Sequence, residues 1–188
     1  MKGLYTVSKA SEACVEIKKS QFIAYLFPYA SFNEAMENIR GKHPKGRHYV
    51  WAYRTINDNG QIEENSSDDG EPKNTSGKPT LKAMEGHSLI ECAIITVRYF
   101  GGIKLGTGGL VRAYNDAAQS VIGSAQLISM DSLYTESITV PYDRIQPLEY
   151  LIEKEGLTIL DRSFDALTAT FKLQGEENRF AEVRELEI

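Results

Sequence analysis

Residues 98–114 read RYFGGIKLGTGGLVRAY, and the organisation of the chain is clearest from this stretch outward. An apolar, β-branched run at 91–100 leads into it, and apolar residues recur with helical spacing over 109–125. We therefore predict a strand, a glycine-rich turn and a helix in succession. Glycine at this density is costly in backbone entropy, which indicates a structural or binding purpose. The glycines of the turn are Gly101, Gly102, Gly106, Gly108 and Gly109.

The glycine-rich turn differs from the standard phosphate-binding motifs. A helix N-terminus after glycines can bind an anion, because its free amides point outward. A P-loop, however, ends in Gly-Lys-Ser/Thr, whereas Gly109 is followed by Leu110 and Val111. The dinucleotide fingerprint would need a third glycine where Val111 stands. We therefore expect no cofactor, and a structural turn that also presents a binding surface.

Periodicity and turn residues place the other elements of the N-terminal part. A helix at 31–41 begins with a capping box of Ser31 and Glu34 and ends at Gly41. Residues 57–79 are polar and aperiodic, so we expect a long loop that can contain a short hairpin at Asn59-Gly60. The remaining predictions here are strands at 12–18, 21–27 and 48–56 and a helix at 80–88.

A second series of predicted strands and helices begins after residues 129–132. We predict a strand at 133–142, a helix at 144–156 capped by Asp143, strands at 157–164 and 166–175, and a last helix at 176–186. This βαββα order indicates a small separate α+β domain, which lacks one strand of a complete split βαβ unit. The predicted fold class is therefore α+β, with domains at 1–130 and 131–188.

Charge is unevenly distributed along the chain, whose net charge is −5. Residues 1–131 carry 15 Lys and Arg against 14 Asp and Glu, whereas residues 132–188 carry 6 against 12. Between Asn38 and Asn57 there are several Lys, Arg and His side chains and no acid. Such a patch can attract polyanions even on an acidic chain, although a solvated face is the commoner explanation.

Basic residues of this patch and of the glycine-rich turn are the candidates for phosphate contact. Along the strand at 48–56, His48 and Arg54 share one face, and Trp51 lies on the other with two tyrosines. Those aromatics can stack single-stranded bases or can belong to the core. The candidate phosphate-binding residues are Lys45, Arg47, His48, Arg54, Arg98, Lys104 and Arg112, with the five glycines allowing close approach.

Three carboxylates in the predicted loop, Asp68, Asp69 and Glu71, form a second candidate site. Such oxygens suit a hard cation, but solvated loop acids are the ordinary alternative. Thr75, Ser76 and Lys78 follow closely and can hold a phosphate or pair with those acids. No nucleophile, base and orienting group can be assembled, so an enzyme is the less favoured interpretation.

The two cysteines, Cys14 and Cys92, lie in apolar strand-like runs without a CxxC pair. We expect buried free thiols in a reducing, cytoplasmic compartment. No signal peptide is recognisable, and no apolar run is long enough to span a membrane.

Four segments in order resemble the YigZ/IMPACT family. They are KKSQFIAYL (18–26), HYVWAYR (48–54), SDDGEPKNTSGKP (67–79) and the opening stretch at 98–114. The resemblance covers about residues 5–125, and Ser76 stands where most members carry alanine. It implies a first domain similar to the second domain of a small-subunit ribosomal protein and a second similar to a ferredoxin-like domain of elongation factor G.

The resemblance also implies a link to translation, because eukaryotic members regulate translation during amino-acid starvation. Our first hypothesis is a protein that binds RNA, the ribosome or a translation factor through the basic glycine-rich surface. The second is a metal-dependent hydrolase or phosphate-handling enzyme that uses Asp68, Asp69 and Glu71. The third is a protein–protein interaction module.

Overall fold

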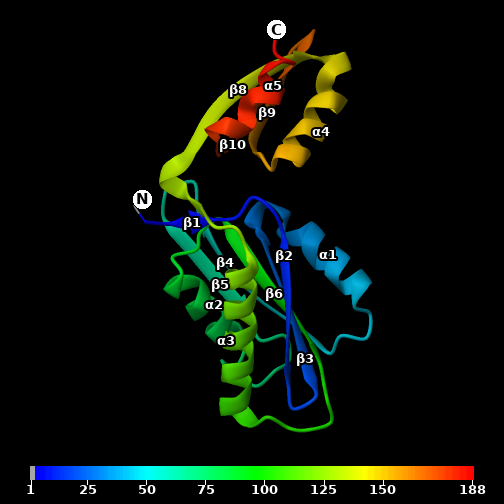
Figure 1. The fold of residues 1–188 in the computed structure, drawn as a ribbon, viewed down its shortest axis with the longest axis vertical. Coiled ribbons are helices and arrows are strands. Elements are labelled where there is room, and N and C mark those ends of the chain that lie inside the picture. The colour runs from blue at the N-terminus through cyan, green and yellow to red at the C-terminus, as the bar shows by residue number, and fades with distance from the viewer. Residues whose placement is uncertain (1–2) are drawn as a thin grey trace. The chain divides into compact units, whose positions relative to one another are not determined.

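The computed structural model describes residues 3–188, which form two compact units at 3–127 and 128–188. Both units combine helices with antiparallel sheet, so the predicted α+β class is confirmed (Figure 1). Two short strands, β1 (Tyr5–Thr6) and β7 (Ile128–Ser129), lie outside the main sheets. Each unit has its own cluster of buried apolar side chains and is described by itself below.

The N-terminal unit is built on a five-stranded antiparallel sheet in the order β2-β3-β6-β4-β5. Its central strand, β6, is buried along almost its whole length, as its continuous apolar run predicts. The edge strand β2 instead alternates between half-buried and exposed residues. The strands are β2 (Ser11–Ile17), β3 (Ser20–Pro28), β4 (His48–Ile56), β5 (Ile62–Ser67) and β6 (Cys92–Tyr99).

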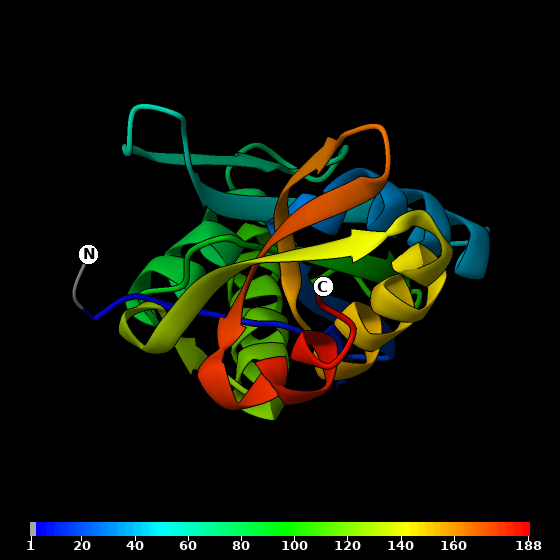
Figure 2. The same cartoon turned by 90° about the horizontal axis from the view of Figure 1, so that it is seen from above.

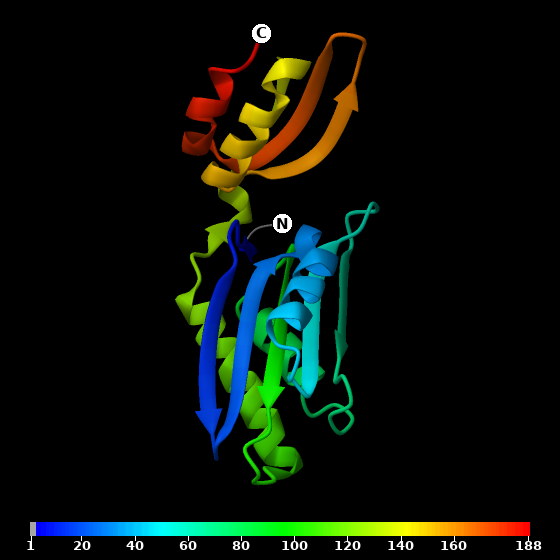
Figure 3. The same ribbon diagram turned by 90° about the vertical axis from the view of Figure 1, so that its right-hand side faces the viewer.

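Helices cover both faces of this sheet (Figure 3). On one face, α2 (Gly77–Gly86) and α3 (Gly106–Ser124) pack on Val50 and Ala52 of β4. On the other, α1 (Phe32–Lys42) packs against the aromatic side chains of β4. The predicted alternation along β4 is confirmed. Trp51 meets Phe32 edge-on at 5.5 Å between ring centroids, which favours the core explanation of that tryptophan.

Local details of α1 and of the predicted 57–79 loop differ from the expectation. The Ser31 side chain makes no cap hydrogen bond, because a 3-10 turn at Tyr29–Ser31 leads directly into α1. Gly41 lies inside the helix, which ends at Lys42.

The predicted long loop at 57–79 is wrong in part, since its residues form β5 and the start of α2. The hairpin predicted at Asn59-Gly60 is confirmed, because the turn there joins β4 to β5 with Ile56 opposite Ile62. Sequence periodicity missed the rest of β5 because most of its side chains are exposed.

The C-terminal unit is a three-stranded antiparallel sheet with helices on one face (Figure 2). Its strands, in the order β8-β10-β9, are β8 (Leu133–Pro141), β9 (Thr158–Phe164) and β10 (Thr168–Glu176). Phe171 of β10, Leu148 of α4 (Ile145–Glu155) and Val183 of α5 (Ala181–Arg184) share its core. Gly156 ends α4 in the left-handed conformation, at φ 68°. Asp143, predicted as the cap of α4, makes no side-chain cap bond and lies in a 3-10 turn, Tyr142–Arg144.

The two free cysteines have different surroundings. Cys92 on β6 is buried, and burial raises the pKa of its thiol to about 12. Cys14 is exposed on the edge strand β2, so the prediction that both thiols are buried is wrong for Cys14. Within residues 3–188, none of the helices has both the length and the apolar character that a membrane span requires.

Candidate anion-binding site

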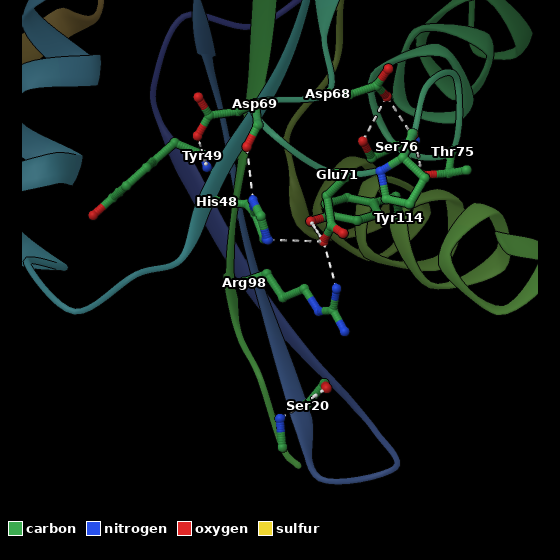
Figure 4. Close-up of polar contacts among 12 residues, drawn as sticks. Ser20, His48, Tyr49, Asp68, Asp69, Glu71, Thr75, Ser76, Arg98 and Tyr114 are labelled. Atoms are coloured by element: carbon green, nitrogen blue, oxygen red, sulfur yellow. Dashed lines mark hydrogen bonds and ion pairs between the residues drawn. The ribbon is translucent and has the colours of Figure 1, made fainter. Parts of the chain in front are cut away.

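The predicted acidic loop is held by hydrogen bonds within the N-terminal unit. Asp68 accepts the backbone amides of Asn74, Ser76 and Gly77 at 2.7, 3.1 and 2.9 Å, and the Ser76 hydroxyl at 2.7 Å (Figure 4). These groups surround the first turn of α2, so Asp68 supplies the cap that Ser76 does not. Burial opposes ionisation, but these hydrogen bonds outweigh it and hold the pKa of Asp68 below its ordinary value.

Asp69 holds the loop against strand β4. Its carboxylate accepts the backbone amide of Tyr49 at 2.7 Å, and its backbone carbonyl lies 2.7 Å from His48 Nδ1. A carbonyl can only accept, so Nδ1 carries the proton and donates it. This bond directs the other ring nitrogen, Nε2, toward Glu71 Oε1 at 3.9 Å. The position of the histidine ring is therefore fixed by the loop.

Glu71 enters the interior and pairs with Arg98 of β6. Arg98 Nη1 and the Tyr114 hydroxyl donate to Oε1 of Glu71 at 2.6 and 2.8 Å (Figure 4). Both charged side chains are buried, with 8% of Arg98 and 4% of Glu71 exposed. Burial and then the negative charge of Glu71 raise the pKa of Tyr114, which stays a neutral donor. Arg98 Nε is buried without a hydrogen-bond partner among the described residues.

A pocket of about 390 Å³ is lined in part by the buried pair of Glu71 and Arg98. Its charged lining comes from three segments: Arg47 and His48 at the start of β4, Arg98 at the end of β6, and Lys104 in the glycine-rich turn. The exposed ring of Phe100 lies beneath two guanidinium groups, 6.0 Å from Arg47 and 5.6 Å from Arg98. Glu71 is the acid in this lining, and its carboxylate is already bonded to Arg98. The pocket therefore presents net positive charge.

The glycine-rich turn forms one wall of the pocket, and it requires glycine at two positions for different reasons. A Cβ on Gly101 would lie 2.0 Å from the backbone carbon of Lys19, so only glycine allows the turn to pass the β2–β3 hairpin. Gly106 opens α3 at φ 72°, a conformation that favours glycine. Leu105, at the N-cap, gives no side-chain cap bond, so the first amides of α3 are available beside Lys104.

A family model described as the Impact N-terminal domain matches residues 18–122. An "IMPACT family member" of Haemophilus influenzae is 37% identical over 154 residues, which are 80% of this chain and 75% of that relative. The chain belongs to the IMPACT family. The family member YigZ of Escherichia coli is 33% identical over 156 residues, covering 80% of this chain and 76% of YigZ. A crystal structure described as that of a hypothetical protein aligns with 97% of this chain and 90% of its own, at 28% identity and a TM-score of 0.64.

In this IMPACT-family chain the predicted phosphate-binding residues separate into groups. The pocket brings together Arg47, His48, Arg98, Lys104 and Gly106. Arg54 lies elsewhere on β4, where it donates to Glu64 at 3.0 Å and to the Leu89 carbonyl at 2.8 Å. Lys45 is exposed in the loop after α1 and does not line this pocket. Lys78 and Arg112 line a different pocket, described below.

The carboxylates proposed for a metal do not converge. Asp68 faces the start of α2, Asp69 faces the Tyr49 amide, and Glu71 faces Arg98. The described part of the chain contains no group of three or more His, Cys, Asp or Glu side chains that could hold a metal ion. Thr75 is likewise used within the loop, donating its hydroxyl to the Pro72 carbonyl at 2.7 Å.

Sequence reasoning missed Phe100, Thr107 and Leu110 as pocket residues. Phe100 could have been predicted, because it is an aromatic residue directly before a glycine pair at the end of a buried strand. Thr107 and Leu110 gave no such signal, because they line the pocket only through the way α3 packs on the sheet.

Proposed function

We propose that the protein binds the phosphate backbone of RNA, in a translation-associated role, through the pocket at the start of α3. The observation that carries this proposal is the convergence of Arg47, Arg98 and Lys104, from three segments, on the uncapped N-terminus of a 19-residue helix. Fixed positive charges beside free amides favour phosphate oxygens. The association with translation rests on the IMPACT family resemblance.

The charges of the pocket are available to a ligand. Arg47 and Lys104 are exposed, and neither forms an ion pair with a described residue. Arg98 donates to Glu71, which also accepts the Tyr114 hydroxyl, so the Arg98 guanidinium is held in one orientation at the base of the pocket. Phe100 adds an exposed ring on which a base can stack. Backbone contact with stacking is typical of single-stranded RNA rather than of a duplex.

The test is the affinity for a fluorescein-labelled single-stranded oligoribonucleotide, measured by anisotropy over a salt series. We expect binding to weaken steeply with salt, with Lys104→Gln lowering the slope of log affinity against log salt by about 0.7. Lys172→Gln removes the same charge from an exposed position on β10 and serves as the control. An affinity that barely changes with salt contradicts the proposal.

One observation favours the phosphate-handling alternative. The bond from His48 Nδ1 to the Asp69 carbonyl leaves Nε2 as the unprotonated nitrogen, which lines the anion pocket 3.9 Å from Glu71 Oε1 and suits a general base. Incubation of the labelled RNA with the protein, with and without Mg²⁺, tests this function. Cleavage that is lost in His48→Gln supports it, and intact RNA under both conditions contradicts it.

The interaction-module alternative is separated from RNA binding by partner capture from a cell lysate. The comparison is made with and without nuclease treatment. Partners that are lost after nuclease treatment support RNA binding. Partners that persist after nuclease treatment and depend on Lys104 support a protein-binding surface.

A further inference from the structure

A second basic pocket, of about 490 Å³, lies between helices α2 and α3. Lys78 and Lys82 line it from consecutive turns of α2, and Arg112 lines it from α3. Residues four apart on a helix project from the same side, so both lysines face Arg112 across the pocket. The side chains of Asn74 and Asn115 complete its polar lining, which contains no carboxylate.

The three positive charges of this pocket are not neutralised by the part of the chain that the structure describes. Lys78, Lys82 and Arg112 are all exposed, and none of them forms an ion pair or hydrogen bond with a side chain among residues 3–188. Asp68 accepts amides at the start of α2, and Asp116 lies 3.5 Å from Asn115 Nδ2. Three unpaired cations in one concave site favour a multiply charged anion.

The second pocket continues from the anion site along the same elements. Thr107 and Leu110 of α3 line the first pocket, and Val111, Arg112 and Asn115 line the second. The turn between β5 and α2 likewise contributes Pro72 to one and Asn74 to the other. At a helix rise of 1.5 Å per residue, Thr107 and Arg112 are about 7.5 Å apart along the axis of α3. A single phosphate cannot fill both sites, whereas a strand with successive phosphates can.

We infer that the α2–α3 pocket is a second phosphate subsite, so that the ligand is a single RNA strand whose backbone crosses both pockets. This inference rests on the proposed function and specifies its ligand. Lys78, Lys82 and Arg112 contact backbone phosphates beyond the one held by Arg98 and Lys104. Because phosphate contacts carry no base information, this subsite adds affinity and length dependence rather than sequence preference.

Two labelled RNA probes test the inference, a strand of about 12 nucleotides and, as the shorter strand, a dinucleotide with a single internucleotide phosphate. Anisotropy gives their affinities for the full chain and for single variants. We expect Lys82→Gln and Arg112→Gln each to weaken binding of the longer strand and to lower its salt slope by about 0.7 per lost contact. Neither variant should change binding of the shorter strand, which needs only the first pocket. Lys104→Gln should weaken binding of both strands.

Lys172→Gln is the matched control for the loss of one charge on an exposed residue. If Lys104→Gln weakens binding of the longer strand while Lys82→Gln and Arg112→Gln leave it unchanged, the second subsite is wrong and the proposed function stands. If neither strand binds the unmodified protein, the proposed function itself fails. Equal weakening of both strands by Arg112→Gln overturns the two-pocket arrangement.

Discussion

The acidic loop at 67–79 and the glycine-rich turn at 100–109 both have unusual compositions, yet they use their charges in opposite ways. The carboxylates of Asp68, Asp69 and Glu71 are all engaged by groups of the same unit. The ammonium group of Lys104 and the first amides of α3 have no such partner among residues 3–188. A charged loop is therefore a candidate binding site only where the fold leaves its charges without internal partners.

The largest expected effect is at Glu71, where the acidic loop meets the core. Glu71→Ala leaves Arg98 buried without its partner, and we expect a loss of about 3–5 kcal/mol in the free energy of unfolding. Urea unfolding followed by the fluorescence of Trp51, the single tryptophan, reports on this unit. Glu64→Ala breaks the more exposed pair with Arg54 and should cost under about 1 kcal/mol. Equal losses in the two variants would contradict a structural role for the acidic loop.

Two alanine substitutions in the glycine-rich turn should have opposite effects on stability. Gly101→Ala places a Cβ against the Lys19 backbone and should lower the free energy of unfolding by about 1–3 kcal/mol. Gly108→Ala adds a Cβ in open space within α3 and should raise stability by up to about 1 kcal/mol. Thermal unfolding distinguishes them. A similar loss in both variants would mean that the turn is uniformly structural and has no open binding face.

Asp68→Ala removes the cap of α2, and we expect a loss of about 1 kcal/mol at pH 7. The pKa of Asp68 is lowered in the folded state, so its contribution is complete above about pH 4 and is lost as the pH falls further. The difference between the native protein and the variant should therefore shrink in acid. Asp58→Ala, at an exposed loop position, is the control and should show neither effect. A difference that grows on acidification would contradict the ionised cap.

The smallest stability effect is expected at Lys104. Lys104→Gln should change the free energy of unfolding by no more than about 0.5 kcal/mol, because the side chain is exposed and has no partner among the described residues. The same variant should weaken RNA binding, as measured by anisotropy. Urea unfolding of Lys104→Gln gives its free energy of unfolding, which is then compared with that of Glu71→Ala. A large loss of stability would assign Lys104 to the fold instead of to a ligand.

Prediction from the sequence succeeded where the signal was local. The buried strand β6, the helix α3 and the alternation along β4 follow from periodicity within single segments. It also predicted the hairpin turn at Asn59-Gly60, but not the length of β5, whose exposed polar residues show no periodicity. It failed for the Ser31 cap, which a 3-10 turn replaces. The candidate site was predicted as one set of basic residues, but packing separates it into two pockets and removes Arg54.

The sequence by itself determined the fold class and the family, and it identified the glycine-rich turn as a place where the backbone needs unusual freedom. Only the tertiary structure decided which charges remain available. Glu71 and Arg98 are 27 residues apart, and they form a buried ion pair because the loop folds onto β6, which leaves the pocket with a net positive charge from Arg47 and Lys104. Arg47 and Lys104 line one pocket because the start of β4 pairs with the end of β6, which leads into the glycine-rich turn. Partnership between charges depends on distances through space, and those distances are set by packing rather than by order along the chain.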